Sequence, residues 1–188
     1  MNMIMNGPVP PERQAASKYN YKIFALINGL SYMCLGETVI ILLAVQLNCK
    51  DYIVSALGAM LYFGFLLLPL GKIVTAHVGA AQSQGIFWIL RNISALIVAA
   101  ATPVCIYVSQ TLAVIILLAG AFLFYGFRAA GVVMSQPLIG DISSNLDRAR
   151  LIARSTGLFY AFGLAAMVTI SANHTTGSRA AAWAASTP

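Results

Sequence analysis

Residues 137–154, which read PLIGDISSNLDRARLIAR, hold five charged side chains in a chain where only 9% of residues are charged. Between Tyr52 and Gly140 the sequence has no acidic residue, and an apolar run about long enough to cross a bilayer lies on each side of the charged stretch. Charged groups at this density are stable in water and not in hydrocarbon, so the stretch must connect two membrane spans. Its three arginines predict a cytoplasmic position, because cytoplasmic loops carry an excess of basic residues. We call residues 137–154 the charged island.

The composition agrees with a protein that lipid covers. The chain has 188 residues, of which 60% are hydrophobic, and its mean hydropathy is +0.82. Soluble domains carry about 25% charged residues, so this chain cannot form a polar surface around itself. The composition predicts an all-α, multi-pass protein of the cell membrane. Its net charge of +6 is spread between apolar runs, where it would meet lipid headgroups, and does not indicate nucleic-acid binding.

Several classes of function lack their sequence features. The three cysteines have no metal-like spacing, and the two histidines are far apart. No apolar core with a small-residue cleavage site follows the polar N-terminus, so no cleaved signal peptide is expected. The chain has neither a nucleophile motif nor a phosphate-binding glycine loop. We therefore expect neither an enzyme nor a cofactor or metal protein.

Hydropathy divides the chain into a cytoplasmic lead (1–20), a helical bundle (21–172) and a disordered tail (173–188). Two polar residues, Asp51 and Asn145, are predicted N-caps. The bundle should contain five membrane spans, at about 21–47, 52–70, 86–108, 111–134 and 155–172.

The basic residues agree with this topology. An odd number of spans places the N-terminus in the cytoplasm and the C-terminus outside, with nine basic residues on the inner side and two, Lys50 and Arg179, on the outer side. The tail has neither the apolar density of a sixth span nor the pattern of a soluble domain. It is therefore read either as the end of a chain that stops early, through truncation, a frameshift or a gene-fragment boundary, or as the end of a complete five-span protein.

Glu37 is the main candidate for function, because it lies near the middle of the first span. A carboxylate there costs at least about 2.5–3.5 kcal/mol on insertion scales, and intramembrane acids are usually functional. It could face a solute or proton pathway, or be a protonated group bonded to a neighbouring helix. Asn28, Ser31 and Thr38 share a helical face, but at 100° per residue Asn28 and Glu37 are on opposite faces. The candidates for the pathway are Glu37, Asn28 and Thr38.

Two arginines lie inside apolar runs. Arg91 and Arg128 each lie about 18 residues, or about 27 Å of helix, from the predicted turn at Ser109-Gln110. That distance predicts that both reach the inner headgroup level, where long side chains extend to the surface. A role in gating or in binding an anionic substrate is the alternative. In the last span, the small residues Gly157, Ala161 and Ala165 recur every four residues and predict a close helix contact.

The order and lengths of these elements resemble the N-terminal part of a major facilitator superfamily transporter over residues 20–172. In the charged island, Gly140-Asp141 followed by Asp147-Arg148-Ala149-Arg150 is similar to a loosened form of the family's charged loop motif. The loop after span two, at Gly71-Lys72, lacks the aspartate of that motif. Such transporters have twelve spans in two halves. The resemblance implies that this chain forms most of one six-helix half.

The resemblance also implies a function, namely secondary transport of a small solute by alternating access, coupled to protons or sodium. Asp141, Asp147, Arg148 and Arg150 would then form a cytoplasmic latch, with Arg91 and Arg128 as inner partners. The expected partners are the lipid bilayer, the solute, and a missing C-terminal half or another chain. The alternatives are a non-transporting membrane scaffold or assembly protein and an inactive transporter fragment.

Overall fold

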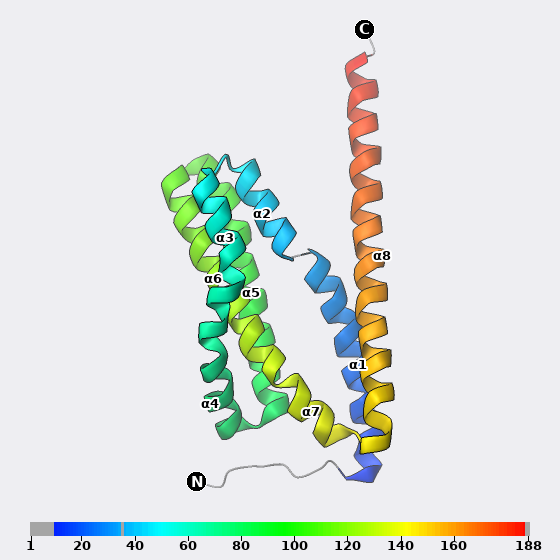
Figure 1. Cartoon of the computed structure of the whole chain (residues 1–188). Coiled ribbons are helices and arrows are strands. Elements are labelled where there is room, and N and C mark those ends of the chain that lie inside the picture. The colour runs from blue at the N-terminus through cyan, green and yellow to red at the C-terminus, as the bar shows by residue number, and fades with distance from the viewer. Residues whose placement is uncertain (1–9, 35, 187–188) are drawn as a thin grey trace.

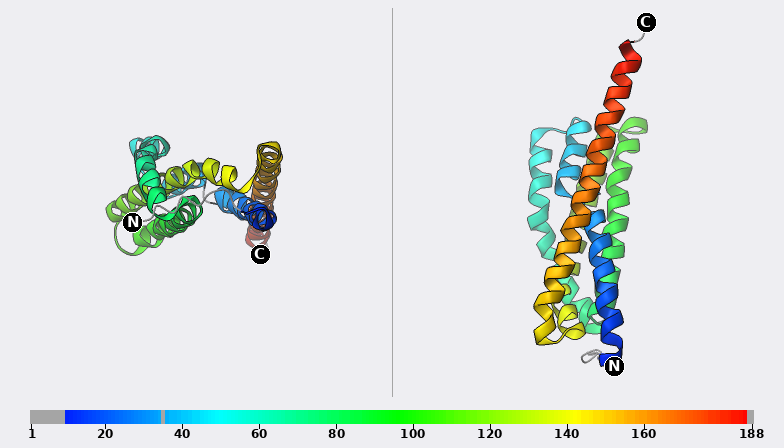
Figure 2. Two further views of the ribbon diagram at one scale, coloured as in Figure 1. Left: turned by 90° about the horizontal axis from the view of Figure 1, so that it is seen from below. Right: turned by 90° about the vertical axis from the view of Figure 1, so that its right-hand side faces the viewer.

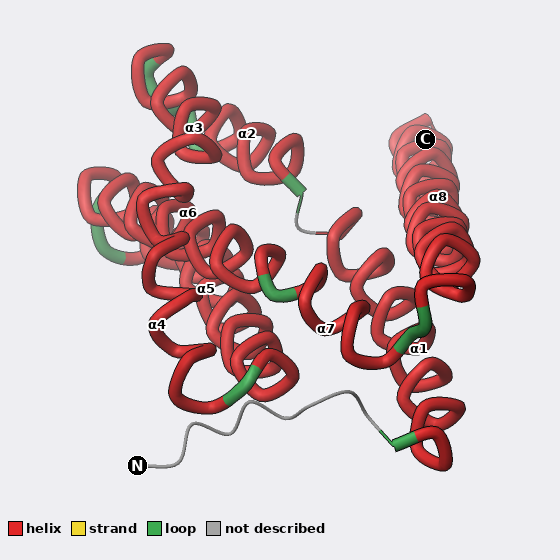
Figure 3. Tube along the Cα trace, turned by 60° about the horizontal axis from the view of Figure 1, so that its bottom comes forward, coloured by secondary structure: helices red, strands yellow, loops and turns green. Residues whose placement is uncertain are grey.

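The computed structural model describes residues 10–34 and 36–186, and for Pro11, Cys34 and residues 170–186 it describes the backbone alone. Within the described residues the chain is almost entirely helical and has no strand (Figure 3). Five helical stretches in this part are long and apolar enough to cross a membrane: Glu12–Gln46, Asp51–Val78, Ala80–Tyr107, Gln110–Ile142 and Asn145–Thr169. The all-α class and the five candidate spans are thus confirmed.

Breaks within these stretches divide the chain into shorter elements. In order they are α1 (Pro11–Cys34), α2 (Glu37–Gln46), α3 (Asp51–Gly64), the 3-10 turn η1 (Phe65–Leu67), α4 (Leu68–Val78), α5 (Ala80–Tyr107), α6 (Gln110–Val133), α7 (Ser135–Ile142) and α8 (Asn145–Ser186).

The helices are longer than the sequence predicted. The loop expected over 72–85 is mostly helix, because α4 and α5 are separated only by Gly79, whose φ of 87° suits a residue without a side chain. Pro69, which lies at the predicted end of the second span, is in the first turn of α4, where its missing N–H costs nothing. The predicted lead over 1–20 is helical from Pro11 onward, and residues 1–9 lie outside the described residues.

The N-caps and the C-terminal tail also differ from the prediction. Asp51 is the first helical residue of α3 and Lys50 its N-cap. Ser144, and not Asn145, caps α8, because its hydroxyl and carbonyl oxygens accept from the backbone N–H of Asp147. The tail predicted to be disordered continues α8 as helix to Ser186, in agreement with the high helix propensity of its alanines. Residues 187–188 lie outside the described residues.

The helices form two groups (Figures 1 and 2). Helices α2 to α6 pack together, with α5 against α6 and α3 and α4 against α6. Helices α1 and α8 pack along each other as a separate pair, and α7 crosses from the end of α6 to the start of α8. The core of the larger group is apolar and includes Leu117, Ala121 and Phe124, each no more than 1% exposed. We call these groups the α2–α6 group and the α1–α8 pair.

The α1–α8 pair is held by glycines that the sequence pattern did not identify. A Cβ at Gly29 would lie 2.8 Å from the backbone carbonyl carbon of Phe159, so the two backbones nearly touch. A Cβ at Gly163 would lie 2.8 Å from Cγ of Met33. The expected contact through Gly157, Ala161 and Ala165 is wrong, because these three residues are exposed and nothing lies within 4 Å of Gly157.

Candidate functional site: a buried arginine cluster between the helix groups

The first of the five candidate spans is discontinuous. α1 ends at Cys34 and α2 begins at Glu37, with Gly36 in an extended conformation before it and Leu35 outside the described residues. Because α1 packs on α8 whereas α2 packs on α3, this break is where the chain passes from one helix group to the other. Glu37 is therefore the first residue of α2, and its side chain is half-buried beside the break.

Arg91 of α5 is the centre of the site, and it joins the two groups. Its side chain is only 2% exposed. Nη1 donates to Oδ1 of Asn28 at 2.8 Å and Nη2 donates to Oγ of Ser31 at 2.9 Å, both on α1. Nη2 also donates to Oδ1 of Asn92 at 3.1 Å. All three acceptors are neutral, so the charge of Arg91 is solvated by amide and hydroxyl oxygens without a carboxylate.

Aromatic rings complete the surroundings of Arg91. Its guanidinium carbon lies 4.2 Å from the centroid of the Trp88 ring and 5.8 Å from that of Phe124. Cation–π contacts contribute about 0.5–2 kcal/mol, more when the cation is desolvated, as it is here. They offset part of the cost of burying a charge that has no counter-ion.

Several polar atoms near this centre have no hydrogen-bond partner within the described residues. They are Nε of Arg91, Nε1 of Trp88 and Oη of Tyr125, all fully buried. A buried donor left unsatisfied costs about 1–3 kcal/mol. Such atoms are uncommon in folded proteins, and here one belongs to Arg91, one to Trp88, which contacts Arg91, and one to Tyr125 on α6.

Arg128 and Glu37 extend the cluster. The guanidinium carbon of Arg128, on α6, lies 4.4 Å from the centroid of the Tyr32 ring on α1. Arg128 and Arg91 therefore both contact side chains of α1, and Glu37 lies just beyond the end of that helix. Two cations, on α5 and α6, and one carboxylate, beside the break between α1 and α2, therefore lie where the two helix groups meet. We call Glu37, Arg91 and Arg128 the charged cluster.

An open groove of about 460 Å³ adjoins the cluster. Ser31 and Asn92, two of the acceptors for Arg91, lie on its wall, and its other lining side chains are apolar. The residues that line it are Ser31, Ile89, Asn92, Ile93, Ala95, Leu96 and Ala99. A small solute in the groove would therefore meet polar atoms that are bonded directly to Arg91.

The structure changes the expectations for the predicted pathway residues. Asn28 and Glu37, predicted to lie on opposite faces of one helix, belong to two separate helices, so the count of 100° per residue does not apply across the break. Asn28 binds Arg91, whereas Thr38 is exposed on α2. Arg91 lies eleven residues, or about 16 Å, inside the start of α5 and points to α1, and its predicted position at the inner headgroup level stays a prediction.

Of the predicted latch residues, only Asp147 has an ion-pair partner among the described residues. Its Oδ2 accepts from Nζ of Lys18, on α1, at 3.1 Å. Arg148 places Nη2 over Gly140, Arg150 faces α1, and Asp141 is half-buried on α7. Sequence reasoning missed Lys18, although Lys18 and Lys22 are spaced by one helical turn and so mark a basic stripe on α1.

No known protein family, curated protein or solved structure matches this chain. Its chemistry must therefore be inferred from the side chains that the fold brings together. Among the described residues, no group of His, Cys, Asp and Glu side chains could hold a metal ion. What it offers is a buried cation, unsatisfied donors, a nearby carboxylate and an adjoining groove, which suit binding of a small solute.

Proposed function

We propose that this chain is the N-terminal part of a secondary transporter of the major facilitator type, which moves a small solute by alternating access. The observation that carries the proposal is Arg91, a buried arginine without a carboxylate partner, at the joint between two helix groups. Ionisable groups inside membrane helices usually belong to a solute or ion pathway. Transporters commonly place that pathway at interrupted helices, and the break between α1 and α2 lies beside this cluster.

The joint also suggests how binding could move the helices. Side-chain bonds from Arg91 to Asn28 and Ser31 link the α2–α6 group to α1. A solute that accepts from Arg91 replaces one of these acceptors and loosens the link. The α1–α8 pair would then shift as a unit relative to α2, since its own glycine contact keeps it together. Binding therefore shifts the population between two arrangements of the groups.

The charges of the site favour an anionic solute. Arg91 and Arg128 contribute two positive charges, and the stretch that contains them, from Tyr52 to Gly140, has no acidic residue. Two unit charges 4 Å apart attract by about 4 kcal/mol at an effective dielectric constant of 20. Glu37 is the one carboxylate of the cluster, and its protonation would remove a negative charge that repels the solute. We therefore infer that Glu37 couples proton movement to anion movement.

Binding can be measured with the protein's own fluorescence, because Trp88 contacts Arg91. The sequence has one other tryptophan, so Trp183→Phe leaves Trp88 as the sole reporter. Lactate, succinate and inorganic phosphate are the probes, with glucose as the neutral comparison. Arg91→Gln should weaken anion binding about 10- to 150-fold, since a hydrogen bond to a charged group contributes about 1.5–3 kcal/mol. Lys72→Gln removes an exposed cation and is the control.

Transport is tested separately, by uptake of the same radiolabelled anions into liposomes that contain the purified chain. The proposal expects uptake that Arg91→Gln abolishes and that Lys72→Gln leaves unchanged. If Trp88 reports anion binding but no anion is taken up, transport by this chain is refuted and a binding or scaffold role remains. If no probe changes the fluorescence of Trp88, the anion site is refuted.

A further inference from the structure

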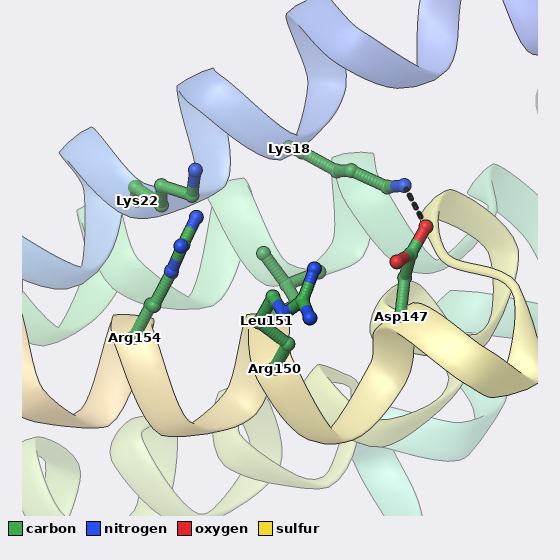
Figure 4. Close-up of a pocket in the computed structure, with 6 residues that line it drawn as sticks. All are labelled: Lys18, Lys22, Asp147, Arg150, Leu151 and Arg154. Carbon is green, nitrogen blue, oxygen red and sulfur yellow. Dashed lines mark hydrogen bonds and ion pairs between the residues drawn. The ribbon is translucent and has the colours of Figure 1, made fainter.

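A second group of cations lies away from the charged cluster, where α1 and the start of α8 run side by side (Figure 4). A pocket of about 170 Å³ opens there, lined by Lys18, Lys22, Asp147, Arg150, Leu151 and Arg154. We call it the basic pocket. Its residues come from helix turns that begin the apolar stretches of α1 and α8.

Sequence spacing explains why four cations meet in one place. Lys18 and Lys22 are four residues apart on α1, and Arg150 and Arg154 are four residues apart on α8, so each pair lies on one face of its helix. Figure 4 shows both faces turned toward the same hollow, with Lys22 and Arg154 pointing toward one another.

The pocket has a strong excess of positive charge. Asp147 is its only carboxylate, and Lys18 already binds that carboxylate at 3.1 Å. Within the described residues, Lys22, Arg150 and Arg154 take part in no ion pair or side-chain hydrogen bond. Like charges one turn apart destabilise a helix, and each helix here carries such a pair. An anion between these side chains would relieve the repulsion in both pairs.

The floor of the pocket is fixed by apolar packing. Leu151 is 4% exposed and packs with Ile139 and Ile142 of α7, against which Tyr21 of α1 also lies. The glycine contact between Gly29 and the backbone of Phe159 holds α1 and α8 together further along. The spacing of the four cations is therefore set by the fold and does not depend on an ion that binds there.

We propose that the basic pocket binds a phosphate group. Guanidinium groups match phosphate oxygens with paired hydrogen bonds, and lysines add charge without fixed geometry. Basic pockets between membrane helices bind anionic lipid headgroups, and this pocket lies where two apolar stretches begin, the depth at which headgroups lie. The phosphate belongs to an anionic phospholipid or to a soluble phosphate, and the experiment distinguishes these sources.

The test compares lipid binding by the purified full chain in nanodiscs. Discs of phosphatidylcholine, with or without phosphatidylglycerol, supply the lipid source, and native mass spectrometry counts the lipids retained. Arg150→Gln/Arg154→Gln should lower the preference for phosphatidylglycerol about 10- to 150-fold, the effect of losing one hydrogen bond to a charged group. The matched control, Arg13→Gln/Lys72→Gln, removes the same charge from exposed positions outside the pocket and should keep the preference.

A second arm adds inorganic phosphate to phosphatidylcholine discs and follows the melting temperature of the chain. A rise in the wild type and the control, absent from Arg150→Gln/Arg154→Gln, assigns the site to soluble phosphate. An equal loss of phosphatidylglycerol preference in both double variants refutes the pocket, because it indicates a general surface charge. Absence of both effects also refutes it. Lys22→Gln repeats the test if the arginine double variant does not fold.

Discussion

The close approach of α1 and α8 leads to a graded prediction for three glycine variants. Replacing glycine by alanine inside a helix gains about 0.8–1.0 kcal/mol of helix propensity at every position. The variants therefore differ only in what the new methyl group meets. At Gly157 nothing lies within 4 Å, at Gly163 it meets the flexible end of Met33, and at Gly29 it meets the backbone of Phe159.

These neighbours determine the sign of each effect. Gly157→Ala should stabilise the chain by the full propensity gain of about 1 kcal/mol. Gly29→Ala gains the same amount, but the backbone of α8 cannot rotate away, and overpacking costs about 1–3 kcal/mol. The difference between the two variants is therefore about 1–3 kcal/mol. Gly163→Ala should fall between them, because the Met33 side chain can change rotamer.

The assay is equilibrium unfolding of the purified chain in mixed micelles of dodecyl maltoside and sodium dodecyl sulfate, followed by circular dichroism. The free energy of unfolding is compared among the three variants and the wild type. If Gly29→Ala is as stable as Gly157→Ala, the backbones of α1 and α8 do not touch at Gly29. The packing of the α1–α8 pair described above would then be wrong.

Three further predictions concern side chains in and near the two sites. Glu37→Gln should strengthen anion binding, because it removes the charge that repels the solute, and should make liposome uptake insensitive to a pH gradient; uptake that still follows the gradient would clear Glu37 of coupling. Tyr125→Phe removes a buried hydroxyl that has no partner in the described chain, so it should raise the unfolding free energy by about 1 kcal/mol, and a clear loss of stability would reveal a hidden partner. Lys18→Gln should lower the melting temperature at low salt and have little effect in 1 M NaCl, because salt screens its half-exposed pair with Asp147; an equal effect at both salt concentrations would contradict an ionic contact.

The all-α class and the five spans could be predicted because hydropathy is a local property that adds up over about 20 residues. The tight turn at Ser109 lies where the sequence predicted it, between α5 and α6. The charged island could be recognised for the same reason, although its first part folds as α7 and its second part as the start of α8. Helix ends were less predictable, because residues 72–78 and 80–85 have the propensity of neither a clear helix nor a clear loop.

The contacts that make the sites could not be read from the chain. Asn28 and Arg91 are 63 residues apart, and counting residues along α5 gives the depth of Arg91 but not the partner that its side chain meets on α1. The break before Glu37 invalidates the count of 100° per residue between Asn28 and Glu37, and Gly36 has no local feature that distinguishes it from the other glycines of the chain.

By itself, the sequence determined how many stretches are long and apolar enough to cross a membrane and which stretches are too charged to enter lipid, because both depend on the composition of neighbouring residues. Only the tertiary structure decided that Gly29 and not Gly157 touches another helix, and that Lys18 meets Asp147. The physical reason is that hydrophobic burial has no direction. The partners of each face are chosen by steric fit between backbones that lie far apart in the chain.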